Sequence, residues 1–337
     1  MRAIGYKTPG PIDAENSLVD IDLPRPRPAG RDLLVEVRAV SVNPVDTKVR
    51  KRAGAEGDGW KVLGFDASGV VVETGPDAEA FKPGDAVFYA GSIDRPGTNS
   101  EFHLVDERIV GPKPKTLSDA QAAALPLTAI TAWETLFDRL GVRRPVPGAA
   151  NAVLIVGGAG GVSSVAIQLA RQLTDLIVIA TASRPETREW VESLGAHQVV
   201  DHSKPMAPQM AALGLGKPSF VFITNGTDGH QADIAELVAP QGRVGLIDDP
   251  QAFDATLFKG KAVSLNWESM FARPVHQTAD MDEQGQLLRE VSRLVDAGTL
   301  RTTAAERLSP INAQNLRKAH ELIECGRARG KVVLEGF

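Results

Sequence analysis

Cysteine is almost absent from this chain of 337 residues, because Cys325 is the only one. A single cysteine excludes an intrachain disulfide framework and a structural zinc cluster built on cysteines. Long apolar runs are also missing: no stretch approaches the roughly 18 residues that a membrane span needs, and Met1–Gly5 begins no signal-peptide core. The sequence therefore predicts a cytoplasmic protein of a reducing compartment, without a membrane partner.

The chain also lacks a strong excess of one charge. It has 37 Lys and Arg against 42 Asp and Glu, a formal net charge of −5, and its basic residues are scattered. This distribution provides no basic surface for nucleic acid or an anionic membrane, so we expect small molecules as partners. The length of 337 residues is sufficient for two domains that each bury a core.

Glycines are concentrated in the segment Asn151–Val162, NAVLIVGGAGGV, which combines a short apolar strand, a turn and the start of an amphipathic stretch. Glycines let the backbone approach a pyrophosphate closely, and a following helix N-terminus favours the anion. The pattern Gly-x-Gly-x-x-Gly is incomplete because Ser163 is third, so the motif alone fits an ordinary turn equally well. The expected phosphate contacts are Gly158, Ala159, Gly160, Gly161 and Val162.

Two patterns divide the chain. Before about residue 124, short alternating or apolar runs separated by turn residues are typical of β structure, at 33–40, 69–73, 85–89 and 101–105. After Asn151, apolar segments alternate with helical ones, which predicts a parallel sheet covered on both faces. The expected strands are 153–156, 176–180, 219–223, 243–247 and 262–265, and further on we expect helices at 281–298 and 312–325 and a strand at 331–334.

The end of the second parallel strand bears on the choice of cofactor. A site for NAD places Asp or Glu there to accept from the ribose 2′-hydroxyl, whereas this chain has Thr181, Ala182, Ser183 and Arg184. Arg can bind a 2′-phosphate through paired charge-assisted hydrogen bonds, so Ser183 and Arg184 predict NADPH. A second interpretation, compatible with the first, is that Ser183 and Glu186 form a helix capping box and Arg184 is solvated.

Further cofactor contacts are expected where other parallel strands end, because ligands bind open α/β sheets at that edge. Thr224 and Asn225 follow one such strand, and Ile247 and Asp248 end the next.

Five motifs occur in an order that resembles the medium-chain dehydrogenases/reductases: NPVD at 43–46, GFDASG at 64–69, FKPGDAV at 81–87, LPLTAITAW at 125–133 and the glycine turn. They look most like the zinc-free, quinone oxidoreductase-like branch. The resemblance implies an α/β protein in which a Rossmann doubly wound parallel sheet is inserted into a GroES-like, β-rich catalytic domain. We expect residues 1–127 and 272–337 to form the catalytic domain and 128–271 the NADPH-binding domain, with the active site at their junction.

The resemblance also addresses the metal. Zinc-dependent members carry a ligand Cys in the first motif and Gly-His-Glu in the second, where this chain has Asn43 and Gly64-Phe65-Asp66, and the second expected Cys near Ala124 is missing. Catalytic zinc requires three protein ligands and an open position. We therefore expect no metal.

By the same resemblance, Asn43 and Thr128 would lie beside the nicotinamide, and the Asn43 amide would orient the carboxamide or the substrate oxygen. Its alternative role is that of an Asn-Pro turn residue. Tyr89 would donate to the substrate oxygen or form a half-buried strand end. His202 stands where relatives often carry a tyrosine against the adenosine ribose or 2′-phosphate, with a solvated loop residue as the alternative. Lys331 matches a closing-motif lysine near the cofactor, unless it is a plain surface lysine.

Aromatic residues are the expected walls of a pocket for flat, apolar acceptors: Trp60, Tyr89, Trp267 and Phe271. Trp60 could instead anchor its loop, and Trp267 and Phe271 could cover a dimer interface along the edge strand 261–266. Asp46 and Asp66 are expected to organise the site through hydrogen bonds, because neither has a paired carboxylate in the sequence.

Without zinc, the carbonyl that receives hydride must be polarised by hydrogen-bond donors, or the acceptor must be strongly electrophilic. The sequence therefore predicts a homodimeric, NADPH-dependent, metal-independent reductase of quinones or α,β-unsaturated carbonyls. The alternatives are a zinc-type alcohol dehydrogenase, an enoyl-thioester reductase and, from another class, a non-catalytic NADPH-binding sensor or structural protein.

Overall fold

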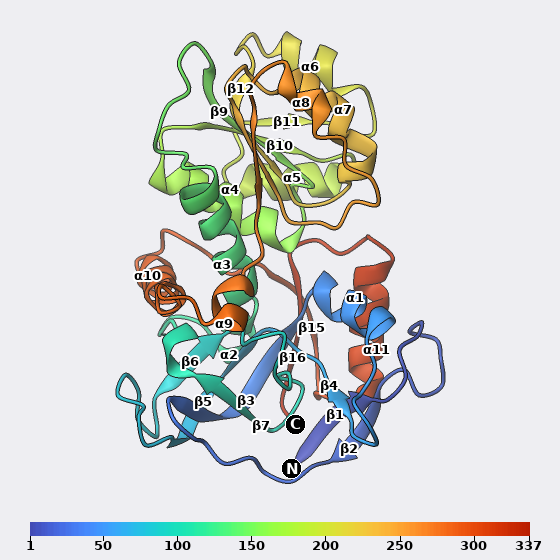
Figure 1. Ribbon diagram of the computed structural model, residues 1–337, viewed down its shortest axis with the longest axis vertical. Helices are drawn as coiled ribbons and strands as arrows, with labels where there is room; N and C mark the ends of the chain where they lie inside the picture. The colour runs from blue at the N-terminus through green and yellow to red at the C-terminus, as the bar shows by residue number, and fades with distance from the viewer. The chain divides into compact units, whose positions relative to one another are not determined.

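The computed structural model describes residues 1–337 and divides the chain into two compact units. Unit 1 comprises Met1–Ile130 and Phe271–Phe337, and unit 2 comprises Thr131–Met270, so that unit 2 is inserted in the sequence of unit 1 (Figure 1). The limits expected from the sequence, 127/128 and 271/272, differ from these by three residues at the first crossing and by one at the second.

Unit 1 contains two sheets of mainly antiparallel strands. The strands are β1 (Arg2–Tyr6), β2 (Val19–Asp22), β3 (Asp32–Val42), β4 (Lys61–Val62), β5 (Ala67–Thr74), β6 (Ala86–Tyr89), β7 (Phe102–Asp106), β8 (Val110–Pro112), β15 (Ala304–Leu308) and β16 (Lys331–Glu335). The smaller sheet has the order β2-β1-β4. The larger one has the order β15-β16-β3-β5-β6-β8, and β7 also pairs with β3. The predicted β-rich texture is therefore confirmed.

Strand β3 is the centre of the larger sheet. Its residues Leu33, Leu34 and Val35 are all fully buried, because partner strands and helices cover both of its faces. Strand β16 pairs antiparallel with it and places Val332 opposite Val42. The last strand of the chain thereby lies beside the end of β3, where the NPVD motif begins.

Helices complete unit 1. They are α1 (Pro44–Arg52), α2 (Asp119–Ala123), α3 (Pro126–Trp133), α9 (Ala272–His276), α10 (Glu283–Asp296) and α11 (Ala313–Glu324), with a 3-10 turn at Glu107–Ile109. The crossing into unit 2 falls inside α3. The predicted amphipathic helices 281–298 and 312–325 are confirmed as α10 and α11, which bury Leu288 and Leu316 completely. None of the helices of the protein is long and apolar enough to cross a bilayer.

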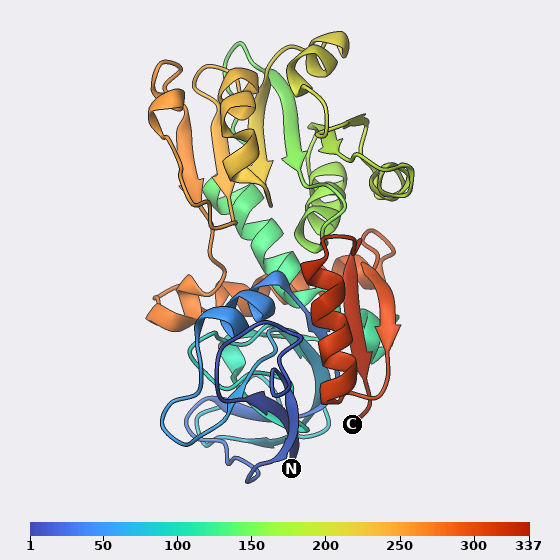
Figure 2. The ribbon, with the colours of Figure 1, turned by 90° about the vertical axis from the view of Figure 1, so that its right-hand side faces the viewer.

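Unit 2 is a doubly wound parallel sheet, as predicted. Its strands are β9 (Ala150–Val156), β10 (Ile177–Thr181), β11 (Gln198–Val200), β12 (Pro218–Ile223), β13 (Arg243–Leu246) and β14 (Ser264–Trp267). Every pair is parallel, in the order β11-β10-β9-β12-β13-β14, and Figure 2 shows several of these strands side by side. The helices are α4 (Gly161–Leu173), α5 (Pro185–Ser193), α6 (Met206–Ala212), α7 (Thr227–Leu237) and α8 (Thr256–Lys259).

Both faces of this sheet are buried. Leu154 and Val156 of β9 belong to a core that includes side chains of α6, α7 and α8, such as Met206 and Phe258. Val153 and Ile155 point to the opposite face, as the two-residue period of a strand requires, and are also fully buried. Burial on both faces explains the nearly continuous apolar runs of these strands, each side chain contributing about 1.5–3 kcal/mol.

Two local predictions are wrong. Helix α5 begins at Pro185 with Arg184 as its N-cap, so the capping box expected from Ser183 and Glu186 does not form; instead the Thr187 hydroxyl accepts from the Arg184 N–H at 3.2 Å. The fixed φ of proline suits the first helical position and sets the cap one residue later. The strand expected at 262–265 is found at Ser264–Trp267, because Ala262 has a φ of +51° and cannot lie in a strand.

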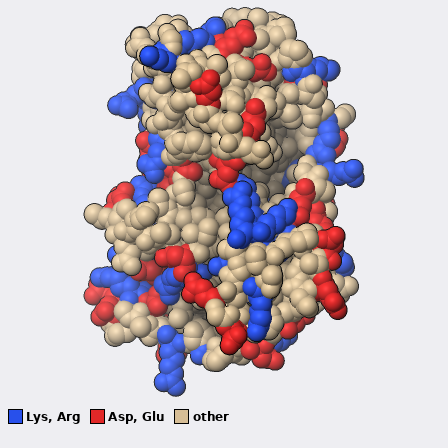
Figure 3. All heavy atoms as spheres, turned by 45° about the vertical axis from the view of Figure 1, so that its right-hand side comes forward, with Lys and Arg blue, Asp and Glu red and all other residues tan.

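Charged side chains are mixed over the surface. On the face drawn in Figure 3, Lys and Arg side chains lie among Asp and Glu side chains, and acidic residues border the largest group of basic ones.

Two buried glutamates meet in unit 2. Glu134 opens the π-helical segment Glu134–Arg139, Glu268 follows β14, and they are only 1% and 5% exposed. The Arg139 Nε donates to a Glu268 carboxylate oxygen at 2.7 Å. Burial, together with the hydrogen bond and charge of Glu134, raises the pKa of Glu268 to about 9. Glu268 therefore keeps its proton at neutral pH.

We predict an alkaline loss of stability from this pair. Because the folded pKa of Glu268 is raised from 4.5 to about 9, its stabilising contribution is complete below about pH 4.5 and is lost as the pH rises through about 9. Glu268→Gln keeps a neutral side chain of similar shape, so its melting temperature should fall less than that of the wild type between about pH 7 and pH 10. Circular dichroism melts measure this, with the exposed Glu189→Gln as control. Equal declines in wild type and Glu268→Gln would contradict the prediction.

Candidate functional site

The glycine turn of unit 2 connects β9 to α4 and leaves no room for a side chain at Gly157 or Gly158. Gly157 has a φ of +81°, and a Cβ there would lie 2.7 Å from the Thr224 hydroxyl. A Cβ on Gly158 would lie 2.8 Å from the Thr181 carbonyl oxygen. Gly160 is the N-cap of α4, a helix of 13 residues. The turn thus presents bare backbone at the N-terminus of a long helix, which is the arrangement that binds a phosphate.

Ser163, the departure from the glycine motif, has a structural function. It is fully buried, and its hydroxyl is 2.8 Å from the Thr224 hydroxyl, which itself donates to the Val156 carbonyl. Ser163 must therefore be the donor to Thr224. This bond ties α4 to the end of β12, where a third glycine would only allow close packing. On the other side, the Thr181 hydroxyl accepts from the Gly157 N–H at 3.0 Å.

The side chains expected around the cofactor ribose lie at the carboxyl ends of the strands of unit 2. Ser183 is exposed, and Arg184 is partly exposed, with its Nε 3.2 Å from a Glu186 oxygen. His202 is half-buried and packs edge-on against His230, with 6.0 Å between ring centroids; burial, followed by the charge of His230, lowers its pKa.

The other residues at the strand ends differ in their exposure and in the hydrogen bonds that they already make. Asn225 is exposed, and Ile247 is partly buried. The carboxylate of Asp248 accepts from the backbone N–H and the hydroxyl of Thr227, at the start of α7. The turn residues Ala159, Gly161 and Val162 are partly exposed.

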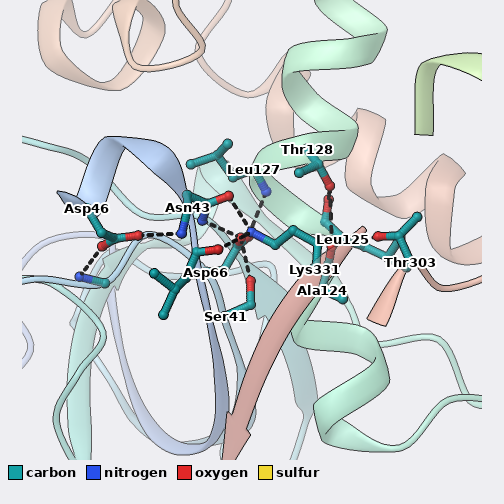
Figure 4. A network of polar contacts seen from close by, with 12 residues as sticks. Ser41, Asn43, Asp46, Asp66, Ala124, Leu125, Leu127, Thr128, Thr303 and Lys331 are labelled. Carbon is teal, nitrogen blue, oxygen red and sulfur yellow. Dashed lines mark hydrogen bonds and ion pairs between the residues drawn. The ribbon is translucent and has the colours of Figure 1, made fainter. Parts of the chain in front are cut away.

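In unit 1, the side chains of Ser41, Asn43, Asp66 and Lys331 meet in a buried polar network (Figure 4). The Asp66 carboxylate accepts from the Ser41 hydroxyl at 2.8 Å, the Asn43 amide at 2.7 Å and the Leu127 N–H at 2.7 Å. The Lys331 ammonium completes it, 3.1 Å from the same carboxylate. Ser41, Asn43, Asp66 and Lys331 are each at most 2% exposed.

Asp46 extends this network. Its two oxygens accept from the backbone N–H groups of Asn43 at 2.8 Å and Gly64 at 3.0 Å. Burial, opposed by these hydrogen bonds and by the charge of Lys331, raises the pKa of Asp46 to about 7, and the charge of Asp66 adds to the increase. The prediction that both aspartates organise the site by hydrogen bonds agrees with this geometry. The sequence-based reason was incomplete, because the two carboxylates do influence each other.

Lys331 is not a surface residue, so the plain alternative predicted for it is wrong. Its ammonium donates to the Val42 carbonyl at 3.0 Å, to the Asn43 side-chain oxygen and to Asp66. An ammonium has three donors, and all three are used. Burial lowers the pKa of Lys331, and the charge of Asp66 opposes that shift. Direct contact between Lys331 and a cofactor, as expected from the sequence, would require one of these bonds to break.

Thr128 and Tyr89 are buried as well. The Thr128 hydroxyl donates to the carbonyls of Leu125 at 2.9 Å and Ala124 at 3.3 Å within the α3 region. Tyr89 is fully buried, its hydroxyl is 3.1 Å from the His103 Nδ1 and the two rings are stacked. Burial strongly raises the pKa of Tyr89. The role of Tyr89 as a donor to substrate is therefore corrected: it is a core residue of β6 with His103 as its partner.

The predicted pocket aromatics have different surroundings. Phe271 packs edge-on against Phe65, with 5.3 Å between ring centroids, so that the position expected for a histidine ligand lies in an aromatic pair. Trp60 is 39% exposed and has the Lys7 ammonium 5.0 Å from its ring, which suits a loop anchor. Trp267 is 53% exposed on the edge strand β14 and packs against Phe253.

The donor set does not fit a catalytic metal. No group of three His, Cys, Asp or Glu side chains in the protein is arranged to hold an ion. Asp66 and Asp46 accept hydrogen bonds through both oxygens, and the cation beside Asp66 is Lys331. A metal at this place would have to compete with a fixed ammonium.

Sequence reasoning missed Ser41 and His103. Ser41 is a hydroxyl inside the apolar run of β3 directly before the NPVD motif, and such a polar residue in a buried strand signals a buried partner. No local signal identifies His103, because its partner Tyr89 lies on a different strand.

Comparisons with known proteins cover most of the chain. Residues 29–115 match the alcohol dehydrogenase GroES-like domain, and residues 194–334 match a family described as zinc-binding dehydrogenase. A zinc-type alcohol dehydrogenase-like protein of Staphylococcus aureus is 38% identical over 99% of both chains. The human mitochondrial NAD(P)H oxidoreductase RTN4IP1 is 33% identical over 90% of this chain and 81% of its own length.

Solved structures agree. The crystal structure of a putative zinc-dependent alcohol dehydrogenase protein from Rhizobium etli is 68% identical, with a TM-score of 0.99 over 100% of this chain and 98% of that one. The quinone oxidoreductase of Escherichia coli complexed with NADPH has the same fold, with a TM-score of 0.82 over 100% of both chains at 20% identity. With its GroES-like segment, its inserted parallel sheet and relatives that match it nearly end to end, the chain belongs to the medium-chain dehydrogenase/reductase superfamily of oxidoreductases.

Proposed function

We propose that this protein is an NADPH-dependent, metal-independent reductase that transfers hydride to quinones or α,β-unsaturated carbonyls. The observation that carries the proposal is the buried network of unit 1. Where zinc-dependent relatives are expected to carry ligands, Asn43 is hydrogen-bonded to Asp66 and Lys331, and Phe65 packs against Phe271. Without a Lewis acid, a reductase needs an acceptor that is already electrophilic, or hydrogen-bond donors that stabilise the developing oxyanion.

The glycine turn and the end of β10 support NADPH as the cofactor. The turn Gly157–Gly161, which is bare backbone except for the methyl group of Ala159, suits a pyrophosphate at the N-terminus of α4. No carboxylate follows β10 within 181–184, and Ser183 and Arg184 are accessible to a 2′-phosphate. Bound NADPH supplies the hydride. The E. coli quinone oxidoreductase whose fold is shared was itself solved with NADPH.

Asn43 is the proposed donor to the reacting molecule. Of its two amide N–H groups, one donates to Asp66, and the other is the one we assign to the carboxamide or the substrate oxygen. The protein supplies no evident acid for the product, since the Tyr89 hydroxyl is buried against His103. We therefore propose that solvent supplies the proton to the reduced product.

A homodimer is part of the same proposal. Strand β14 is an edge strand without a charged side chain, and it carries the exposed Trp267. Unprotected edges of this kind pair readily with another strand, and a second copy of β14 is the proposed partner.

The cofactor assignment predicts a preference that can be measured. We expect NADPH to be oxidised with a higher kcat/KM than NADH when a quinone or an enone is the acceptor, and an aldehyde to be reduced poorly. Arg184→Asp should lower kcat/KM for NADPH by about 10- to 100-fold, because a hydrogen bond to a charged group contributes about 1.5–3 kcal/mol. Arg188→Asp, one turn along α5, is the matched control, since Arg188 pairs with Glu192 on the exposed face. Equal use of NADH, unchanged in Arg184→Asp, would refute the 2′-phosphate assignment. Tight NADPH binding without turnover of any acceptor would favour the sensor.

The donor set predicts independence from metal. We expect purified active protein to contain far less than one zinc per chain and to keep its activity after prolonged treatment with a chelator. Elemental analysis by mass spectrometry and the quinone assay measure both quantities on one sample. Stoichiometric zinc, with activity lost on chelation and restored by added zinc, would instead support the zinc-type alcohol dehydrogenase.

A further inference from the structure

The amide of Asn43 is fixed in one orientation. Its oxygen accepts from the Lys331 ammonium, and its nitrogen donates to Asp66 at 2.7 Å. If the amide were flipped, its N–H groups would face the ammonium and its oxygen would face the carboxylate, so both contacts would become repulsive. Because Asn43 is only 1% exposed, water cannot compensate for that loss.

Asn43 and Asp46 form a capping box at the start of α1, but helix capping alone does not explain this orientation. Asn43 precedes Pro44 at the start of α1, but the carboxylate at that terminus comes from Asp46, which accepts the Asn43 backbone N–H at 2.8 Å. The side-chain amide of Asn43 is directed instead to Asp66 and Lys331, which lie on other segments of the chain (Figure 4).

Lys331 holds the oxygen of the Asn43 amide and has no donor left for a bound molecule. It is 2% exposed and uses all three donors within the protein. One of them goes to the Val42 carbonyl, adjacent to Asn43 in the chain. The pairing of Val332 with Val42 in the β16–β3 ladder brings Lys331 next to Asn43.

We infer that Lys331 is a positioning residue for the proposed reduction: its ammonium holds the oxygen of the Asn43 amide, so that the group Asn43 presents to a bound molecule is an N–H donor. The inference rests on the proposed function only for the identity of that molecule. Asp66 accepts one N–H of the same amide and leaves the other for the bound molecule. We call this arrangement of Lys331 and Asp66 around the Asn43 amide the clamp. An oxyanion that forms as hydride is delivered would then always meet a donor.

Kinetics of Asn43→Ala, Lys331→Met and the double variant test the coupling. We expect each single variant to lower kcat for a quinone on the order of 10- to 100-fold, because a small misplacement of a donor has an effect of that size. The double variant should be no slower than the slower single one. Lys113→Met is the control, since Lys113 also pairs with a carboxylate and a backbone carbonyl of unit 1 but away from the network.

A variant that only loses stability must be separated from one that loses positioning. Lys331→Met leaves Asp66 as an unpaired buried charge, so the protein could fail to fold. Lys331→Met with Asp66→Asn removes the ion pair as a neutral unit and still lacks the clamp on the Asn43 oxygen. Because an amide accepts fewer hydrogen bonds than the Asp66 carboxylate, this variant should melt below the wild type but above Lys331→Met, and it should remain slow. Wild-type kcat in this folded variant, or additive losses in the double variant with Asn43→Ala, would overturn the inference.

Nuclear magnetic resonance can measure how firmly the Asn43 amide is held, without any enzyme turnover. In protein labelled with 15N-asparagine, the side-chain amide protons of Asn43, assigned from their absence in Asn43→Ala, should exchange slowly with solvent. Lys331→Met with Asp66→Asn should accelerate that exchange at least on the order of tenfold, because a released amide can rotate. Unchanged exchange would refute the positioning role. A protein that reduces no acceptor but shows the accelerated exchange would refute the proposed function and leave the clamp supported.

Discussion

The buried ion pair between Lys331 and Asp66 is the constraint on which unit 1 depends. A charge inside a protein must be paired, and removing one partner of such a pair typically costs about 3–5 kcal/mol. Lys331 comes from the last strand, Asp66 from the segment before β5, and the groups that complete their hydrogen bonds come from β3 and α3. The C-terminal strand must therefore return to β3 before either charge is satisfied, which couples the two ends of the unit.

The same pair supports the proposal that the site needs no metal. A metal ion in relatives would supply a local positive charge, and here Lys331 supplies one, neutralised by Asp66. Burial raises the pKa of Asp46 to about 7, and the charge of Asp66 adds to this increase while that of Lys331 opposes it. Phe65 stands where zinc-dependent relatives are expected to carry a histidine ligand, and it packs against Phe271 as an apolar pair.

Much of the fold, and part of the site, could be predicted from the sequence. The glycine turn, the parallel strands and helices α10 and α11 carry local patterns of periodicity and turn chemistry, and the family motifs add the insertion of one unit in the other. What could not be predicted depends on contacts distant in sequence. The local sequence around Lys331 is compatible with a surface lysine. Its burial depends on its partner Asp66, which is 265 residues away in the sequence. The local sequence suggests that Tyr89 is an available hydroxyl at a strand end. In the structure its hydroxyl contacts His103 of β7.

Helix α3 connects the two kinds of buried charge in this protein. At its start, Asp66 accepts the N–H of Leu127, where a carboxylate favourably meets the positive end of a helix. Directly after its end, Glu134 lies against Glu268 and contributes to the raised pKa of that carboxyl group. The crossing between the units falls within the helix, and Glu268 stands shortly before the second crossing at Met270. The protonation of one cluster and the pairing of the other therefore act on the same eight residues of backbone. A substitution that alters either cluster therefore changes what anchors one end of α3.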